Sequence, residues 1–180
     1  MKKNNYRKKN IIYFIPIPEE FIKLWVWYKI DLSILKDCNF NVIICNSYFD
    51  VVKNIFHVDA VYGWWWNRMM PVVILSKILN KKVVSAGAVH MLDISGSSDF
   101  HSKSFLSRMF TSISLRNSDV NVFMSRDQLL SITSHIKTNN PKLVYSCTKR
   151  NLNQISDSHK LKKSWLDSNF DNNNKRINNL

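Results

Sequence analysis

The sequence predicts an α/β protein, with a doubly wound, Rossmann-like parallel sheet of about six strands and flanking helices. The first observation is that short apolar runs recur along the chain, and their β-branched, continuous character suits strands buried on both faces. These runs are Ile11 to Ile15, Asn41 to Cys45, Asp59 to Gly63, Lys82 to Ala86, Asp119 to Met124 and Lys142 to Ser146. The second observation is that helix-length segments separate them, as in successive βαβ units.

Helix signals follow the third and fifth runs. After the third run, Asn67 can cap a helix, Pro71 falls in the predicted first turn, and Asn80 can close the end. Directly after the fifth run, Ser125 is suited to an N-cap, and Asp127 is favourable in the first turn. Both segments are therefore predicted to be helices that connect parallel strands.

The segment after the fourth run carries one apolar stripe at helical spacing, which is typical of a helix face packed on a core. The stripe consists of Phe105, Leu106, Met109, Phe110 and Ile113. Lys103, Arg108 and Arg116 lie off the stripe and are expected on the surface. An anionic bilayer would attract such cations by about 1 kcal/mol each, so we expect them to contact a membrane surface.

The predicted organisation has three parts. Residues 1–10 form a basic arm, residues 11–150 form one Rossmann-like domain, and residues 151–180 form a polar tail that is expected to be disordered. The longest uninterrupted apolar run, Met69 to Leu75, is far shorter than the roughly 20 residues of a membrane-spanning helix. The apolar stretch after the arm contains two prolines and meets Glu19 and Glu20, which does not suit a signal peptide, so a cytoplasmic location is expected.

Charge is the strongest feature of the composition. The 180 residues contain 26 Lys and Arg against 13 Asp and Glu, a formal net charge of +13. Two windows inside the predicted domain lack acids, from Asp59 to Asp93 and from Asp99 to Asp119. Such a surface attracts anions, and anionic lipid, a nucleotide-sugar diphosphate or nucleic acid would each fit it. The three cysteines match no metal motif and are expected to be buried, reduced thiols.

Ligands of open parallel sheets bind outside the carboxyl ends of the strands, so the loops after the strands carry the candidate site residues. The loop from Gly87 to Ser102 is the longest and most polar of them. In it, His90 could hydrogen-bond a substrate hydroxyl or phosphate, and Asp93 could orient it or do the same. The alternative is a histidine satisfied within its own loop. The spacing of His90, Asp93, Asp99 and His101 matches no metal cage, so no metal is expected.

Three consecutive tryptophans, Trp64, Trp65 and Trp66, follow the third run. Aromatic side chains near a helix start commonly pack into a core, but three neighbours cannot all point into one core. At least one is therefore expected to face the ligand cleft or the solvent. Asn67 and Arg68 end the same loop and are candidate substrate contacts.

Several enzyme classes are excluded by missing motifs. No G-x-G-x-x-G or Walker pattern follows the first run, and the chain has only three glycines, which argues against dinucleotide oxidoreductases and P-loop NTPases. There is no G-x-S-x-G, and the only glutamates, Glu19 and Glu20, are adjacent and cannot flank a substrate.

Three segments resemble the N-terminal half of retaining glycosyltransferases of the GT-B fold, the family 4 or group 1 type. They are Asp59 to Tyr62 with the following helix, Lys82 to His90, and Ser118 to Ser125. The resemblance implies an acceptor-side GT-B domain that transfers a sugar from a UDP- or GDP-sugar, its co-substrate, to a cell-surface polysaccharide or glycolipid. It implies that His90 lies near the donor sugar, as a positioning or charge-stabilising group, and that Ser125 and Arg126 line the cleft.

Two departures from that family bear on activity. The turn after the first run is "PIPEE" instead of glycine-rich, and no glutamate follows Glu20, so the acidic donor motif of the second domain is missing. The resemblance thus implies a hexosyltransferase that is inactive alone and completed by a second chain. The alternatives are a non-catalytic partner subunit or remnant, and, less favoured because no motif supports it, a nucleic-acid-binding protein.

Overall fold

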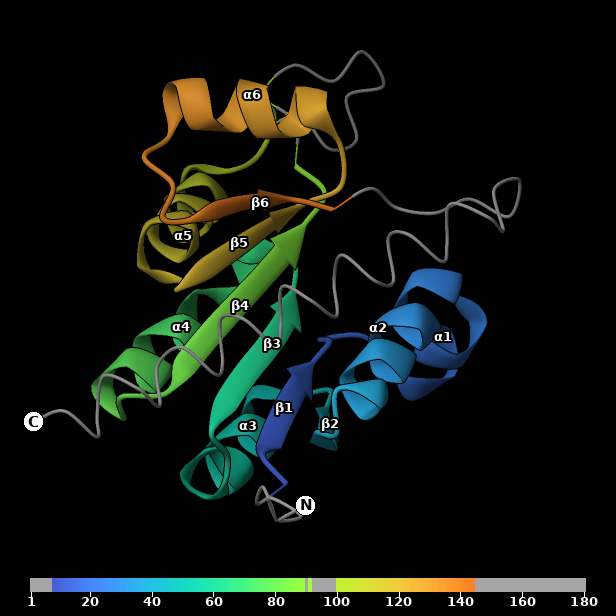
Figure 1. Cartoon of the computed structure of the whole chain (residues 1–180). Coiled ribbons are helices and arrows are strands. Elements are labelled where there is room, and N and C mark those ends of the chain that lie inside the picture. The colour runs from blue at the N-terminus through green and yellow to red at the C-terminus, as the bar shows by residue number, and fades with distance from the viewer. Residues whose placement is uncertain (1–7, 90, 92–99, 145–180) are drawn as a thin grey trace, which may run out of the picture.

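A computed structural model describes residues 8–89, 91 and 100–144. All six strands form one parallel sheet in the order β2-β1-β3-β4-β5-β6 (Figure 1), which confirms the predicted α/β class. The strands are β1 Asn10–Phe14, β2 Asn41–Cys45, β3 Ala60–Trp64, β4 Lys82–Gly87, β5 Val120–Phe123 and β6 Pro141–Leu143. The first five lie within one residue of a predicted run, and β6 ends three residues before its predicted end, because uninterrupted apolar stretches suit strands of a parallel sheet.

The helices divide between the two faces of the sheet. They are α1 Glu19–Leu24, α2 Val26–Asp37, α3 Tyr48–Asn54, α4 Trp66–Ile78, α5 Phe105–Asn117 and α6 Arg126–His135, with a short 3-10 helix at Ile55–His57. Right-handed crossovers send the α1–α2 connection to one face and the later helices to the other, because β2 and β3 lie on opposite sides of β1.

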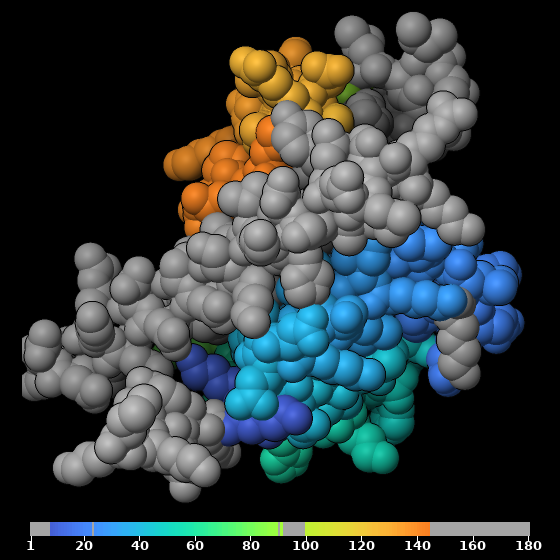
Figure 2. All heavy atoms as spheres, turned by 45° about the vertical axis from the view of Figure 1, so that its right-hand side comes forward, coloured from blue at the N-terminus to red at the C-terminus, as the bar shows by residue number. Residues whose placement is uncertain are grey.

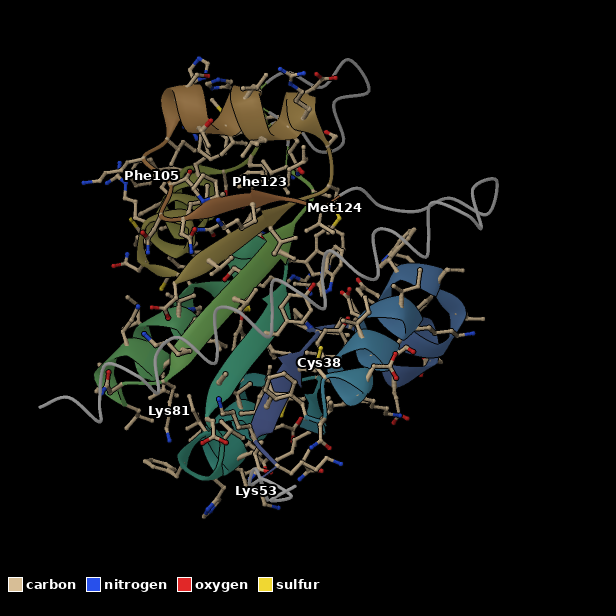
Figure 3. The ribbon with its side chains drawn as sticks, viewed as in Figure 1. Cys38, Lys53, Lys81, Phe105, Phe123 and Met124 are labelled. Atoms are coloured by element: carbon tan, nitrogen blue, oxygen red, sulfur yellow. The ribbon has the colours of Figure 1, made fainter. Side chains whose placement is uncertain are left out.

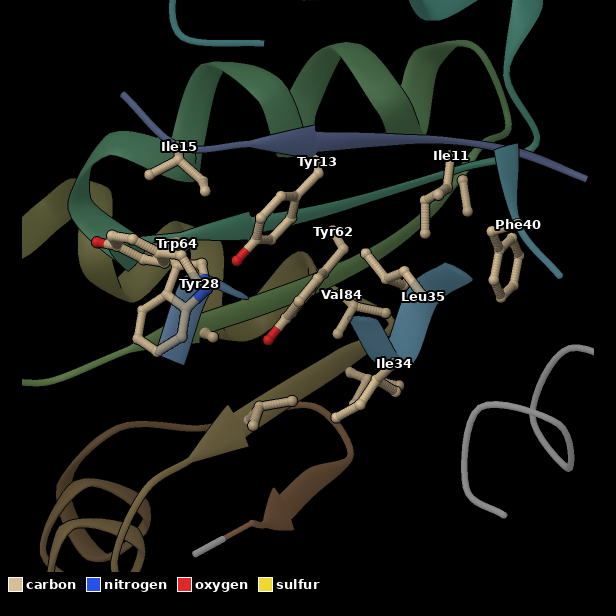
Figure 4. Packing of buried hydrophobic residues seen from close by; sticks show 14 of the residues in the cluster. Ile11, Tyr13, Ile15, Tyr28, Ile34, Leu35, Phe40, Tyr62, Trp64 and Val84 are labelled. Carbon is tan, nitrogen blue, oxygen red and sulfur yellow. The ribbon is translucent and has the colours of Figure 1, made fainter. Parts of the chain in front are cut away.

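Alternate residues of the central strands pack into cores on the two faces of the sheet, whereas the edge strands β2 and β6 are partly exposed. On the α2 face, Ile11 and Tyr13 of β1 pack with Ile34 and Leu35 of α2 (Figure 4). On the opposite face, Ile12 of β1 belongs to the core beneath α3 and α4. This two-sided burial holds the strand ends, and thus the loops that follow them, in fixed positions.

The capping predictions have mixed outcomes. Asn80, at a left-handed φ of 52°, follows the end of α4, and Ser125 caps α6 by accepting from Gln128 N at 3.1 Å; both are confirmed. Asn67 as cap of α4 is wrong, because the helix starts at Trp66 with Trp65 in the cap position. Pro71 consequently lies inside the helix and not in its first turn.

The predicted inward stripe of α5 is also wrong. Phe105 and Leu106 are 70% and 58% exposed, and Phe105 lies on the outside of the helix (Figure 3). The buried residues of α5 are Thr111, Ser114 and Leu115, and the helix packs against α4, which buries Ser76. Small polar residues allow the two helices to approach closely, so the bulky side chains are left facing outward.

Candidate functional site

The connections that follow β1 and β3 leave the carboxyl end of the sheet on opposite faces. These strands are hydrogen-bonded neighbours, with Phe14 opposite Gly63 at their ends. After β1 the chain continues to α1 and α2 on one face, whereas after β3 it continues to α4 on the other. Such a switch point opens a crevice at the sheet edge where α/β proteins bind ligands.

The three tryptophans at this point have three different environments. Trp64 is buried on the α2 face, where its indole Nε1 donates to Asp31 Oδ2 at 2.9 Å. Trp66 is fully buried on the other face, against Phe123 with ring centroids 4.9 Å apart. Its ring lies so close to Gly87 that a Cβ there would come within 2.6 Å of it. Trp65 is half-buried and packs against the core on the α2 face.

Trp65 adopts a backbone conformation that is rare for a bulky residue. Its φ and ψ are 71° and 87°, and its N–H donates to Ala86 O at 2.8 Å. Non-glycine residues held at positive φ cost on the order of 1–3 kcal/mol and concentrate at ligand sites. The turn leads directly from the end of β3 into the start of α4.

The N-terminus of α4 differs from those of the other helices behind the sheet. Ser47, Ser104 and Ser125 accept hydrogen bonds as N-caps of α3, α5 and α6. Trp65 supplies no side-chain cap to α4, and the first turn of α4 contains no acid. The first N–H groups of a helix have no partner within it and carry the positive end of its dipole. An anion is therefore favoured at this end of α4.

Arg68 adds a full positive charge to the same turn. It is exposed, and its guanidinium Nη1 donates to Pro16 O, in the turn after β1, at 2.7 Å. This bond ties the start of α4 to the turn after β1. Glu19 and Glu20, both exposed, begin α1 beside that turn. Their negative charges confine the positive potential to Arg68 and the start of α4.

Aromatic rings from α2 and β3 cluster at this edge. Trp25 stacks on Tyr28 with centroids 5.7 Å apart, and Trp27 meets the same ring edge-on at 6.2 Å. Tyr28 in turn meets Trp64 at 5.3 Å, and Trp64 lies 6.1 Å from Trp65. We call these five residues the aromatic cluster; Figure 4 shows the Tyr28 and Trp64 part of it.

A buried carboxylate fixes α2 onto the sheet beneath this cluster. Oδ2 of Asp31 accepts from Tyr13 OH at 3.2 Å and from Tyr62 OH and Trp64 Nε1, each at 2.9 Å. Burial, followed by the charge of Asp31, raises the pKa of the Tyr13 and Tyr62 hydroxyls well above the ordinary value. Both tyrosines therefore stay protonated and act as donors.

The other predicted substrate contacts are scattered along the edge or lie outside the described residues. Asn67 is half-buried and donates to Ser107 Oγ at 3.4 Å, a weak contact toward α5. Gly87 is buried under Trp66, and Ser125 is engaged as a cap, whereas Arg126 is exposed. His90, predicted for donor positioning, and Asp93, predicted as a substrate contact, lie outside the described residues.

The cations predicted to contact a membrane do not share one environment. Arg116 is exposed, Lys103 is half-buried, and Arg108 is half-buried with an Nε that has no hydrogen-bond partner among the described residues. Of the acid-free window around α4, Lys77 pairs with Asp119 at 2.8 Å at the opposite end of the helix from Arg68. The membrane contact of Lys103, Arg108 and Arg116 stays a prediction. No described helix is long and apolar enough to cross a membrane. Among the described residues, no three or more His, Cys, Asp or Glu side chains are grouped so that they could hold a metal ion.

Asp31 and the rings of α2 are the residues that sequence reasoning missed. The available signal was the aromatic run "WVWY", Trp25 to Tyr28, one short helix after the first strand. Gln128 was missed as well: its Nε2 donates to Gly87 O at 2.9 Å and Val89 O at 3.1 Å, which fixes the start of the loop after β4. Nothing in the sequence marks this glutamine beyond its place in the first turn of α6.

Comparisons with known proteins give no family. No family model matches the chain, and no curated protein matches it. One similar solved structure is from Bacteroides thetaiotaomicron and is described as a "putative phosphomethylpyrimidine kinase" crystallised with pyridoxal. It shares 14% identity at a TM-score of 0.42, over 84% of this chain, and the chain spans 60% of that protein's length. Similarity at this level says nothing about what the chain binds.

The predicted resemblance to GT-B glycosyltransferases is wrong. No glycosyltransferase family model matches, and the solved structure found by the comparison has a different description. The hexosyltransferase activity, the role in polysaccharide or glycolipid synthesis and the peripheral membrane location predicted with it are withdrawn. The resemblance was based on an Asp-led strand, a helix and a strand that ends in a polar loop. This pattern occurs in parallel α/β sheets in general and does not identify a glycosyltransferase.

Proposed function

We propose that the chain is an α/β enzyme domain that binds a phosphorylated small molecule of the nucleotide class at the carboxyl edge between β1 and β3. The observation that carries the proposal is the start of α4. There, an uncapped helix N-terminus with Arg68 in its first turn follows the left-handed Trp65 at the switch point of the sheet. Backbone N–H groups and an arginine at a helix start are the common means of holding a phosphate.

The half-buried and exposed rings of the aromatic cluster support a ligand that is more than a bare anion. Trp25 and Trp27 are 37% and 44% exposed, and Trp65 is half-buried. Indole faces bind flat or apolar rings, so a phosphate carried on a nucleoside matches the combination of charge and aromatic surface. The expected UDP- or GDP-sugar co-substrate belongs to this class and stays a proposal. The second chain and the acceptor expected from the resemblance stay untested predictions.

Calorimetric titration of the full chain with UDP, ADP and inorganic pyrophosphate tests the proposal. Arg68→Ala is expected to weaken binding of all three about tenfold or more, because a charge-assisted hydrogen bond contributes about 1.5–3 kcal/mol. Arg116→Ala is the matched control, since it removes an exposed arginine from the last turn of α5. Equal weakening by both variants, or no binding at millimolar ligand, would contradict the proposal.

A further inference from the structure

Three neighbouring helices on one face of the sheet, α3, α4 and α5, expose large apolar side chains (Figure 1). Tyr48 OH of α3 donates to Arg68 O of α4 at 2.9 Å, and α4 packs along α5. On the other face of the sheet, α1 and α2 form a continuous part of the molecular surface, shown in blue in Figure 2. We call the outward side of α3 to α5 the outer layer; its exposed large apolar residues are Phe49, Val52, Phe56, Ile74, Ile78, Phe105, Leu106 and Met109.

Helical spacing places these residues on one side of each helix. On α4, the exposed Pro71, Ile74 and Ile78 are three and four residues apart, whereas the buried Val72 and Val73 belong to the core beneath the helix. The exposed apolar residues of α3 and of the 3-10 turn after it have the same spacing, and those of α5 lie within one turn. Each helix therefore carries a row of apolar side chains that faces away from the core.

The apolar area of the outer layer is larger than a monomer usually leaves exposed. Phe49, Phe56 and Phe105 are 76%, 63% and 70% exposed, and a phenylalanine presents about 150–250 Å². These three rings alone therefore expose roughly 400 Å², the size of the largest apolar patch on a typical monomer. The remaining members of the layer add to this area. Apolar patches of this size mark surfaces to which another protein binds.

The charge of the same layer indicates which kind of protein fits it. Over residues 66–78 and 105–117, α4 and α5 contain no Asp or Glu, and their basic side chains are Arg68, Lys77, Arg108 and Arg116. Asp119 pairs with Lys77, whereas Arg68 and Arg116 are exposed. A second copy of this chain, itself at a formal net charge of +13, would bring one basic layer against another, which weakens an interface. An acidic partner is attracted instead.

We propose that the outer layer docks an acidic amphipathic helix of a partner protein. The apolar rows of α3 and α4 run on neighbouring helices, so a helix laid along them can pack its own apolar stripe against Val52 and Ile78. Acidic side chains on the flanks of that helix would be attracted by the exposed arginines of α4 and α5. The proposal is independent of the ligand site, which lies at the start of α4.

A synthetic acidic helix tests the proposal with the full chain. The probe is a fluorescein-labelled peptide of about 20 residues, long enough to be helical in water, with leucines at i, i+3, i+4 and i+7 and with glutamate and alanine elsewhere. A second peptide has the same composition, but its leucines are distributed around the helix. Fluorescence anisotropy should show that the striped peptide binds at least tenfold more tightly, since only this peptide can bury its leucines together.

Variants of the chain locate the binding surface. Val52→Asp and Ile78→Asp should each weaken binding of the striped peptide about tenfold or more, because each removes an apolar contact and adds a repelling charge. Leu24→Asp is the matched control. Leu24 is similarly exposed and the change in charge is the same, but it lies on α1, on the other face of the sheet. This variant should keep the wild-type affinity within about twofold.

Several results would overturn the proposal. Equal binding of the two peptides, or equal weakening by Ile78→Asp and Leu24→Asp, would show that net charge alone attracts the probe. Absence of binding at millimolar peptide would also refute it. Sedimentation of the chain without peptide is the last test, and a monomer is expected. A dimer that Ile78→Asp dissociates would show that a second copy, and not an acidic partner, occupies the outer layer.

Discussion

Removing the carboxylate of Asp31 should destabilise the protein more than any single donor around it. In Asp31→Ala, the hydroxyls of Tyr13 and Tyr62 and the indole N–H of Trp64 lose a common acceptor, and all three residues are buried. Each unsatisfied buried donor costs about 1–3 kcal/mol. Relief from burying a charge offsets part of the sum. We therefore expect a loss of roughly 3–5 kcal/mol, a large share of the 5–15 kcal/mol typical of a domain.

Urea unfolding followed by tryptophan fluorescence measures this loss. Tyr62→Phe is the matched control, because it removes one donor and leaves the carboxylate with the other two; it should cost only about 1–1.5 kcal/mol. Asp31→Asn keeps one acceptor oxygen and should fall between the two. If Asp31→Ala cost less than about 1 kcal/mol, or no more than Tyr62→Phe, the three-donor network would not be what holds α2 on the sheet.

Three further predictions concern stability. Tyr28→Phe should leave the melting temperature unchanged or raise it, because the hydroxyl that it removes has no partner in the described structure; a clear fall would show that one exists. Gly87→Ala should cost about 1–3 kcal/mol in urea unfolding, since the new Cβ meets the buried ring of Trp66, and an unchanged midpoint would contradict this packing. Burial, with a smaller effect of Asp50, raises the pKa of Cys45 from 9.0 to about 11. As the pH rises, the unfolded chain therefore releases the Cys45 proton before the folded chain does. Roughly 3 kcal/mol of the free energy of unfolding that is present below pH 9 should be lost as the pH rises to 11. Cys45→Ala should flatten that part of the profile, and an equally steep loss in the variant would refute the assignment.

Much of the sheet could be predicted because its strands are apolar on both faces. Asn41 to Cys45 coincides with β2, and β4 extends one residue beyond the predicted Lys82 to Ala86, to Gly87. The inward face of α5 could not be predicted, because hydrophobic periodicity identifies a helix face but not the neighbour that will cover it. Here the small side chains of Thr111 and Ser114 decided the packing.

The tryptophan turn was singled out from the sequence, but its long-range partners were not. Three adjacent tryptophans cannot share one core, so at least one was expected outside it. In the structure, Trp64 and Trp66 are buried on opposite faces, and Trp65 is half-buried. The partners of Trp64 could not be predicted, because Asp31 is 33 residues away in the sequence and meets it only through the fold. Long-range hydrogen bonds of this kind leave no local sequence signal.

A crystal structure with 5-bromouridine diphosphate tests the central claim most directly, since the anomalous signal of bromine locates the base independently of the phosphates. We expect phosphate density at the backbone N–H groups of Trp66 and Asn67 beside Arg68, and a bromine peak among the rings of Trp25 and Trp65. Phosphates bound at the other end of α4, near Lys77 and Lys82, with the start of α4 empty, would contradict it.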